Sequence, residues 1–391
     1  MLEIILAFFL GIAVGLILGL VPGLHPNMAA FIAAVFITNN PLPAVIFLTA
    51  MAATNVISDF IPSIFLGAPE EGTEMAVMPG HRMLLMGRGY DAVRLSVFGA
   101  AGSCVFIVLA MPAVFLFLPS VFVLIKPYTH VLLIFVLSVM VLSEKYFFRA
   151  LFVAFAAGLI GIFSSKLPLG NELILLPILS GMFGLSYLLL QGTNTKIPKQ
   201  TLFKAYVPEK KSALSVIKGS LGGIISGFLP GVGSSQIASF FATSEHKDEN
   251  YIITIGAIAW SNLFLSILSL WLIDRPRSGI AVAVSSVTDV NFSVIIYIII
   301  TLVAATAIAA LITLFIAKNS VKRISEINYR ILNRLVICTI IIVVAAFTGF
   351  VGLFLLFVCT ALGIYANTAS VKRSIMMSVL IIPTILFYIG V

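Results

Sequence analysis

Charged side chains are scarce in this chain. Of its 391 residues only 10% are Asp, Glu, Lys or Arg, whereas about 25% is usual for a soluble domain. Hydrophobic residues make up 61% of the chain, and the mean hydropathy is +1.17. Polar side chains are therefore too few to cover the surface of a soluble protein of this size. The composition excludes a soluble fold and predicts a multi-pass membrane protein.

Cysteine is scarce as well, and the three residues present all lie inside apolar stretches: Cys104, Cys338 and Cys359. This placement predicts neither a disulfide framework nor a redox centre. The four histidines show no H-E-x-x-H or comparable ligand spacing. We therefore expect no metal site, no bound cofactor and no enzymatic activity.

Long apolar runs, by contrast, fill the chain. A helix needs about 20 apolar residues to cross the hydrocarbon core, and backbone groups in lipid must satisfy their own hydrogen bonds. We expect an all-α polytopic fold with about 10–12 transmembrane or half-spanning helices. No basic residue precedes the first run and no small-residue cleavage site follows it, which favours a retained helix over a signal peptide. The runs are 4–20, 28–37, 43–66, 95–124, 131–143, 147–163, 172–190, 251–272, 292–317, 331–346, 347–366 and 374–390.

The net charge of +8 comes from basic residues that gather in short loops, at 82–94, 196–218 and 318–334. This is the positive-inside pattern, which places these loops on the cytoplasmic side of the cell membrane. There they face the anionic head groups of the membrane lipids. We therefore assign the positive charge to topology and expect no nucleic-acid partner.

An internal repeat links two distant parts of the chain. The segment "GIAVGLILGLVPGLHPN" (11–27) aligns with "GSLGGIISGFLPGVGSS" (219–235), so that three glycines and a Pro-Gly pair coincide. With a slip of one residue, Thr54-Asn55 also falls on Ser261-Asn262. The alignment predicts two membrane repeats, an N-terminal one over 1–190 and a C-terminal one over 212–391.

The segment between the repeats, 191–211, is polar, basic and Pro-containing, which is typical of a cytoplasmic linker. The first repeated helix is preceded only by Glu3, whereas the second follows Lys210, Lys211 and Lys218. The two helices are thus expected to start on opposite sides of the membrane. This favours inverted repeats, with a re-entrant segment in the first half.

Both repeats interrupt a membrane helix at a Pro-Gly pair, Pro22-Gly23 in the first and Pro230-Gly231 in the second. Proline removes a backbone donor and ends the helix, which leaves free carbonyl and N–H groups. In a membrane such groups are tolerated where they line a polar cavity or bind a ligand. A half-helix that restarts after the glycine directs a partial positive charge at the break, so the expected guest is an anion.

Polar residues beside these breaks are the candidate substrate-binding residues. Asn55 and Asn262 occupy matching positions of the two repeats, and we expect them to face each other across the pseudo-symmetry. Asp59, one turn beyond Asn55, either carries a coupling proton or Na+, or lies in an interfacial loop before Pro62. Serine residues after the second break either bind substrate or only cap their own helix. The remaining candidates are Gly23, His25, Asn27, Gly231, Gly233, Ser234, Ser235 and Gln236.

Three segments carry a resemblance to a known family: "GLVPGLHPN" (19–27), "FLGAPEEGTEMAVMPGHRMLLMGRGYDAVRLSVFGA" (65–100) and "GFLPGVGSSQIASFFA" (227–242). With their Pro-Gly breaks and a basic Gly87-Arg88-Gly89 loop, they resemble the TctA family, the large membrane subunit of tripartite tricarboxylate transporters. The resemblance implies ion-driven transport of di- or tricarboxylates. It also implies two partners, a small membrane subunit and an extracytoplasmic binding protein.

Two alternatives stay open from the sequence. Paired Pro-Gly breaks also occur in proteins that translocate polyprenyl phosphates, which are anions too. A role of another class, as an intramembrane enzyme or a membrane scaffold, would not require the two breaks to approach each other. The oligomeric state is also open, a homo-oligomer included. Our prediction is a permease for a small carboxylate, coupled to Na+ or H+.

Overall fold

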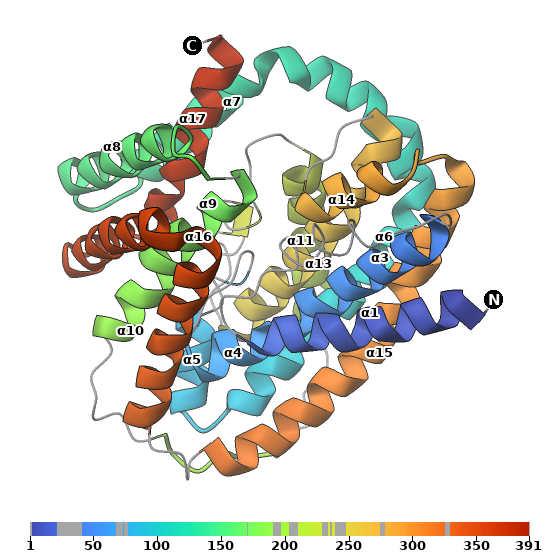
Figure 1. Cartoon of the computed structure of the whole chain (residues 1–391), viewed down its shortest axis with the longest axis horizontal. Coiled ribbons are helices and arrows are strands. Elements are labelled where there is room, and N and C mark those ends of the chain that lie inside the picture. The colour runs from blue at the N-terminus through green and yellow to red at the C-terminus, as the bar shows by residue number, and fades with distance from the viewer. Residues whose placement is uncertain are drawn as a thin grey trace.

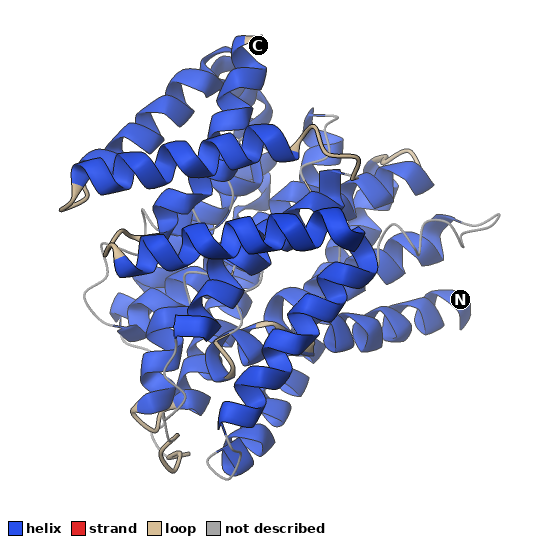
Figure 2. Cartoon of the chain, turned by 60° about the vertical axis from the view of Figure 1, so that its left-hand side comes forward, coloured by secondary structure: helices blue, strands red, loops and turns tan. Residues whose placement is uncertain are grey.

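The computed structural model describes residues 2–21, 41–67, 73, 77–169, 171–190, 197–202, 210–228, 234, 237–238, 248–273, 278–324 and 329–390. Every regular element in these ranges is a helix (Figure 2). The expected all-α class is therefore confirmed for the described part of the chain.

Eight helical segments among the described residues are long and apolar enough to cross a membrane. They are α1 (Leu2–Leu20), α3 with α4 (Pro41–Ser58 and Phe60–Phe65), α6 (Gly89–Ile125), α8 (Phe147–Ser164), the α9–η2–α10 segment (Asn171–Leu179, Ser180–Leu185 and Ser186–Leu190), α13 (Asp248–Ile273), α15 (Phe292–Ile324) and α16 (Tyr329–Thr368). Two shorter apolar helices are α7 (Thr129–Leu142) and the continuous helix formed by η3 (Arg373–Met377) and α17 (Ser378–Ile389). These segments follow the apolar runs of the sequence closely, apart from the run 28–37, which lies outside the described residues.

Large apolar side chains on the outside of the molecule agree with a membrane environment. Leu109, Phe148, Leu311 and Phe350 are each more than two-thirds exposed. Burial of apolar surface is the main favourable term in folding, so such side chains are stable at a surface that meets lipid. In contrast, α3 and α13 are buried along most of their length. These two helices form the centre of the molecule.

The helices form two groups, which Figure 1 shows side by side. The central group contains α1, α3, α4, α5 (Val77–Leu85), α6, α11 (Lys210–Phe228), α13, α14 (Gly279–Val287) and α15, and most of its buried residues form one core. The flanking group contains α7–α10, α16 and α17. Most of these helices surround a second core, and a smaller third core joins α10 to α16 and to the α9–η2 segment. Each group draws helices from both sides of the 191–211 linker. The predicted repeats are therefore not separate bodies, and their boundaries stay a prediction.

Close contact of α1 with α3 explains the glycine spacing of the first repeat. A Cβ atom at each of three glycines would lie no more than 3.0 Å from a carbonyl oxygen of α3. Small residues at this spacing let two membrane helices approach until their backbones touch. The pairs are Gly11 with Phe47, Gly15 with Met51 and Gly19 with Asn55.

Helices α11 and α13 repeat this contact. A Cβ at Gly219, Gly223 or Gly227 would lie no more than 2.8 Å from a carbonyl oxygen of α13. Each glycine of α11 follows its counterpart in α1 by 208 residues (11 to 219), and each contact residue of α13 follows its counterpart in α3 by 207 (47 to 254). The difference of one residue is the slip already seen in the sequence alignment. The partners are Thr254 for Gly219, Ile258 for Gly223 and Asn262 for Gly227. The sequence repeat is thus a repeat of packing, while its inversion across the membrane stays a prediction.

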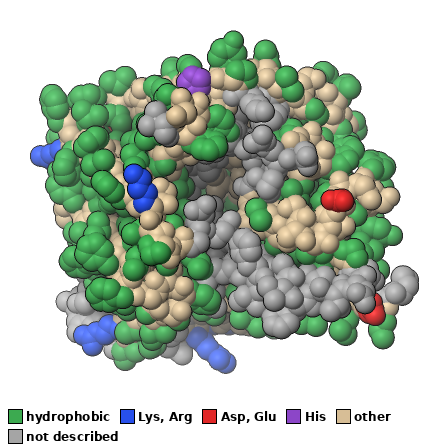
Figure 3. Space-filling view, turned by 45° about the horizontal axis from the view of Figure 1, so that its top comes forward, with side chains coloured by type: hydrophobic (Ala, Val, Ile, Leu, Met, Phe, Trp, Pro, Cys, Tyr) green, Lys and Arg blue, Asp and Glu red, His purple; other side chains and the backbone are tan. Residues whose placement is uncertain are grey.

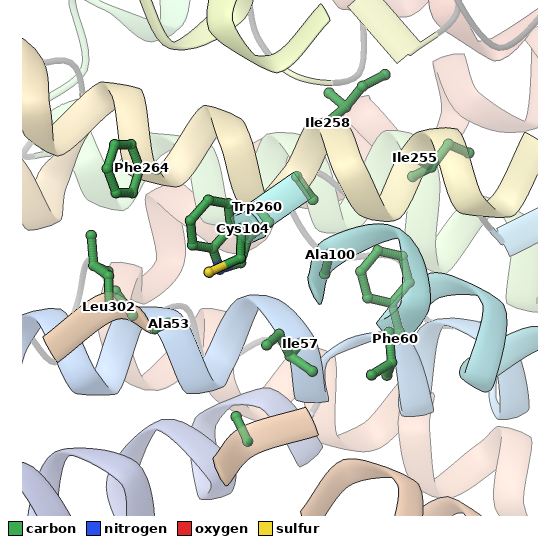
Figure 4. Packing of buried hydrophobic residues seen from close by; sticks show 14 of the residues in the cluster. Ala53, Ile57, Phe60, Ala100, Cys104, Ile255, Ile258, Trp260, Phe264 and Leu302 are labelled. Carbon is green, nitrogen blue, oxygen red and sulfur yellow. The ribbon is translucent and has the colours of Figure 1, made fainter. Parts of the chain in front are cut away.

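The long helix of each predicted repeat packs on the second helix of the other, α6 on α13 and α15 on α3. At the α6–α13 crossing, Gly99 lies against the carbonyl of Ile253 and Gly256 against the carbonyl of Ser96. Figure 4 shows Ala100 and Cys104 of α6 in the layer between α3 and α13. The four helices therefore share one core.

An interruption at Gly349 divides the longest described helix. Gly349 has a non-helical conformation (φ 59°, ψ −154°) and separates α16 into arms at 329–348 and 350–368, which differ in direction in Figure 1. This division corresponds to the two apolar runs 331–346 and 347–366. At Asp59, between α3 and α4, the backbone stays helical (φ −69°, ψ −14°), so that α3 and α4 form one nearly continuous segment.

Candidate functional site

The glycine-lined helices end beside the predicted breaks. Helix α1 ends at Leu20 and α11 at Phe228, each two residues before its proline. Most candidate residues of the breaks lie outside the described part of the chain, so their arrangement stays a prediction. These are Pro22, Gly23, His25, Asn27, Pro230, Gly231, Gly233, Ser235 and Gln236. Of the candidates after the second break, Ser234 is described, and it is helical and buried.

The end of α3 carries a buried polar cluster. The carbonyl oxygen of Asn55 accepts a hydrogen bond from the Asp59 N–H at 3.0 Å and another from Ser58 Oγ at 3.3 Å. The Asp59 carbonyl in turn accepts from the N–H and from Oγ of Ser63, and Ser63 Oγ is 2.6 Å from Thr73 Oγ1. The backbone bonds continue the helical i→i+4 pattern from α3 into α4, and the hydroxyl groups of Ser58 and Ser63 add side-chain bonds to it.

Asp59 is 2% exposed, so it lies inside the protein and not in an exposed loop before Pro62. Gly19, in the last turn of α1, lies against Ser58 and the backbone of Asn55. An ionisable group inside a membrane protein is costly to bury, and such residues commonly mark a substrate or ion pathway. The position is compatible with ion coupling, which stays a prediction.

The matching part of α13 carries uncharged polar groups. Ser226 Oγ donates to Asn262 Oδ1 at 2.9 Å, which connects α11 to α13. Ser266 takes the place of Asp59 under the 207-residue shift, and its Oγ lies 3.2 Å from Oγ of Ser278. Ser278 caps α14 by accepting the N–H of Ala281. The first repeat therefore has a carboxylate where the second has a hydroxyl.

Asn55 and Asn262 were expected to face each other. Within the described part of the chain they are not hydrogen-bonded to each other, and each contacts the glycine helix of its own repeat. In Figure 4, apolar side chains such as Ile57 and Trp260 occupy the region between α3 and α13. The structure brings Asn55 together with Asp59, and Asn262 with Ser226.

A hollow is visible on one face of the molecule, shown in Figure 3. Apolar side chains of described residues form part of its border, and the few charged side chains on this face are scattered.

A third cluster, which the sequence reading did not single out, joins the central group to the flanking group. His81 of α5 is buried, and its Nδ1 is 3.1 Å from the carbonyl oxygen of Ile64. The imidazole meets the Tyr187 ring edge-on with centroids 6.3 Å apart, and the guanidinium of Arg373 lies 4.5 Å from the centre of that ring. Arg373 Nε also donates to Asn367 Oδ1 at 3.0 Å.

Burial lowers the pKa of His81, and the hydrogen bond to Ile64 opposes this only in part. His81 is therefore neutral at physiological pH. In the sequence, Lys372 and Arg373 precede the last apolar run, as basic residues at the cytoplasmic end of a membrane helix commonly do. Arg373 differs from the arginines of the loops in that its side chain is buried.

Comparison with known proteins adds one decisive observation. The family model described as "Tripartite tricarboxylate transporter TctA family" matches residues 5–378. The chain belongs to this family. As a TctA protein it is a membrane subunit of the cytoplasmic membrane with no enzymatic activity, and the family implies a tripartite system with a small membrane subunit and a binding protein.

The TctA chain is also similar to "Uncharacterized protein MJ1079" of Methanocaldococcus jannaschii. The two are 30% identical over 378 residues, which cover 93% of this chain and 92% of the relative. No solved structure matches the chain.

The basic loop that carries part of the TctA resemblance is a structured turn. Gly87 has φ +78°, and its carbonyl accepts hydrogen bonds from the N–H and Oγ1 of Thr201. Gln200 Oε1 accepts the N–H of Gly89, and Gln200 Nε2 donates to the Leu84 carbonyl. Residues 197–202 of the predicted linker are thus held against the α5–α6 turn.

The same turn of the TctA protein forms ion pairs with the start of α13. Arg88 Nη1 lies 2.9 Å from Glu249 Oε1, and Arg88 Nε lies 3.4 Å from Asp91 Oδ2. Partial burial lowers the pKa of Arg88, but the hydrogen bonds and charges of Glu249 and Asp91 raise it more, so the net shift is upward. Arg82 pairs with Asp248 at 3.4 Å. These contacts connect the two predicted repeats at one end.

Proposed function

We propose that this TctA protein is the permease subunit of a secondary transporter that moves a small carboxylate across the cytoplasmic membrane. The observation that carries the proposal is that two helix pairs, α1 with α3 and α11 with α13, pack through glycines at the same spacing and against corresponding residues. Each pair leads into a Pro-Gly sequence at a corresponding position. Paired interruptions of membrane helices point to the binding site of a secondary transporter.

The carboxylate is held by N-termini of half-helices that follow Pro22-Gly23 and Pro230-Gly231, in two inverted repeats. Free N–H groups and the helix dipole at such a terminus attract an anion. Asn55, Asn262 and Ser234 supply polar groups to the lining. The polar ends of α3 and α13, next to the glycine helices, support this assignment.

Asp59 couples transport to Na+ or H+. Its burial within the α3–α4 membrane segment supports the role, because a carboxylate there can help to bind Na+ or carry a proton. The repeats are asymmetric at this point, since Ser266 matches Asp59. A single carboxylate thus provides one coupling site for each transport cycle. The small membrane subunit and the extracytoplasmic binding protein deliver the substrate.

The test is thermal unfolding of the purified protein with citrate or succinate, because ligand binding can be measured without the partner subunits. A ligand stabilises by RT ln(1 + [L]/Kd). We expect stabilisation that requires Na+ or low pH, is lost in Gly231→Leu, and loses its ion requirement in Asp59→Asn. The exposed carboxylate variant Asp289→Asn is the control and keeps the ion requirement.

Absence of stabilisation by any carboxylate contradicts the proposal. Stabilisation by a short-chain polyprenyl phosphate alone would instead favour translocation of a lipid phosphate.

A further inference from the structure

Arg373 is a buried cation at the beginning of a helix. It is 8% exposed and is the first residue of η3, which continues into α17. Its Nε donates to Asn367 and its guanidinium lies over the Tyr187 ring. Nη1 is buried and has no hydrogen-bond partner among the described residues. Part of the guanidinium is therefore a buried donor that is unsatisfied among the described residues.

No described carboxylate forms an ion pair with Arg373, although its neighbour has one. Lys372 Nζ lies 3.4 Å from Glu144 Oε1, and the Lys372 side chain is more than half exposed. The helix that begins at Arg373 adds its own partial positive charge at this end, where an acidic residue is preferred. The positive charge of Arg373 is thus neutralised neither by a described side chain nor by the helix.

A buried charge is stable when it is paired and hydrogen-bonded. Cation–π contact with Tyr187 compensates only part of the desolvation. Arginine has five N–H donors in a planar arrangement that matches a carboxylate or phosphate. A carboxylate or phosphate group would supply the partner that Arg373 lacks among the described residues.

The position of Arg373 relates this oxyanion to transport. Tyr187 contacts both Arg373 and His81, and His81 is hydrogen-bonded to the carbonyl of Ile64. Arg373 and Tyr187 belong to the flanking group, whereas His81 and Ile64 belong to the central group. An anion bound at Arg373 lies at the junction of the two groups of helices.

We propose that Arg373 binds a carboxylate group of the transported anion through Nη1. The inference rests on the proposed carboxylate transport and adds a specific residue to it. His81 is neutral, so Arg373 is the charged member of the His81–Tyr187–Arg373 cluster. The Tyr187 ring holds its guanidinium in place.

The experiment measures the citrate dependence of thermal unfolding in the wild type and in Arg373→Gln and Arg373→Lys. Loss of a charge-assisted hydrogen bond is expected to raise the Kd for citrate about 10- to 100-fold in Arg373→Gln. Arg373→Lys keeps the charge but not the planar donor set, so a smaller increase is expected.

The matched control is Arg149→Gln. Arg149 also lies over a tyrosine, with 4.6 Å to the Tyr146 ring, and donates one hydrogen bond, to the Ala369 carbonyl. It is exposed, however, and the citrate Kd is expected to be unchanged in this variant. An unchanged Kd in Arg373→Gln would overturn the proposal.

Unfolding without ligand separates binding from a purely structural role. Removal of a buried charge that lacks its anion leaves the unfolding temperature of the free protein unchanged or higher. A lower temperature in both Arg373 variants, with the citrate-induced shift retained, would show that the arginine is structural. If Arg373→Gln does not fold, Arg373→Lys decides by the same two measurements.

The proposed function and the role of Arg373 fail in different ways. If carboxylates stabilise the wild type and Arg373→Gln equally, only the Arg373 inference fails. If no carboxylate stabilises the wild type, the proposed function fails, and the same variants are tested with inorganic phosphate and a short-chain polyprenyl phosphate. If either phosphate stabilises the wild type but not Arg373→Gln, Arg373 binds an oxyanion other than a carboxylate. If neither phosphate stabilises the wild type, both proposals are overturned.

Discussion

Gly223 of α11 lies directly against Ile258 of α13, so that a Cβ on the glycine would be 2.6 Å from the Ile258 carbonyl oxygen and closer still to Ser261 Oγ. Gly15 has the same relationship to the carbonyl of Met51 in the first repeat. The two contacts set how closely each glycine helix approaches its partner. Both are therefore sensitive to any added side-chain volume.

Gly223→Val is expected to destabilise the protein by about 1–3 kcal/mol or more, because overpacking forces the two backbones apart. The measurement is the thermal unfolding midpoint in detergent, together with the yield of monodisperse protein. Ile225→Phe is the control, because it adds volume on the exposed side of the same helix. Equal midpoints for the two variants would contradict the close contact of α11 with α13.

Trp260 Nε1 donates to Thr306 Oγ1 at 2.7 Å, which ties α13 to α15. Thr306→Val leaves the buried indole N–H without its acceptor and is expected to cost about 1–3 kcal/mol. Trp260→Phe removes the donor, so Thr306→Val should cost much less in that background. A double-mutant cycle of unfolding free energies measures this coupling. Additive effects would show that the bond does not contribute.

Acid is expected to destabilise the protein through His81. Its pKa is lowered by burial in the folded state, so the unfolded state binds a proton first as the pH falls. Stability is fully present above about pH 6.5, the ordinary pKa of histidine, and decreases below it. Unfolding midpoints between pH 7.5 and 5 should therefore fall less in His81→Phe than in the wild type.

His130→Phe provides the comparison for this experiment, since His130 lies outside the His81–Tyr187–Arg373 cluster. It should keep the acid sensitivity of the wild type. An equally steep decline in His81→Phe would assign the sensitivity to other groups.

Gly87→Ala is expected to loosen the linker from the α5–α6 turn. The residue has φ +78°, which costs an L-residue about 1–2 kcal/mol, and an added Cβ would lie 3.1 Å from the Lys199 carbonyl oxygen. Faster tryptic cleavage at Lys199 is the expected result. Gly390→Ala, with φ +89° and no atom within 4 Å of the Cβ, tests the conformational effect alone. It should leave cleavage at Lys199 unchanged.

The helical segments were predictable because a membrane span is a local property. Length and hydropathy decide whether a segment crosses the bilayer, and both can be read from consecutive residues. The runs 331–346 and 347–366 even anticipated the interruption of α16 at Gly349. The repeated glycines were also readable, since close helix contacts in membranes require small residues at regular spacing.

The candidate site was predictable only in part. Asn55 and Asp59 are close together, as their spacing of one helical turn implies. The expected approach of Asn55 and Asn262 depends on how two distant helices pack, and apolar side chains occupy the region between those helices (Figure 4). Arg373 was missed because charge and hydropathy patterns do not distinguish a buried arginine from a loop arginine.

The sequence by itself determined the membrane class, most of the helical segments, the repeat and the resemblance to TctA. Each of these depends on composition or on residues close together in the chain. Only the tertiary structure decided the division into central and flanking groups, the separate surroundings of the two asparagines, and the burial of Arg373 against Tyr187. These features depend on which side chains fill the space between distant helices, because packing acts through contacts that sequence distance does not constrain.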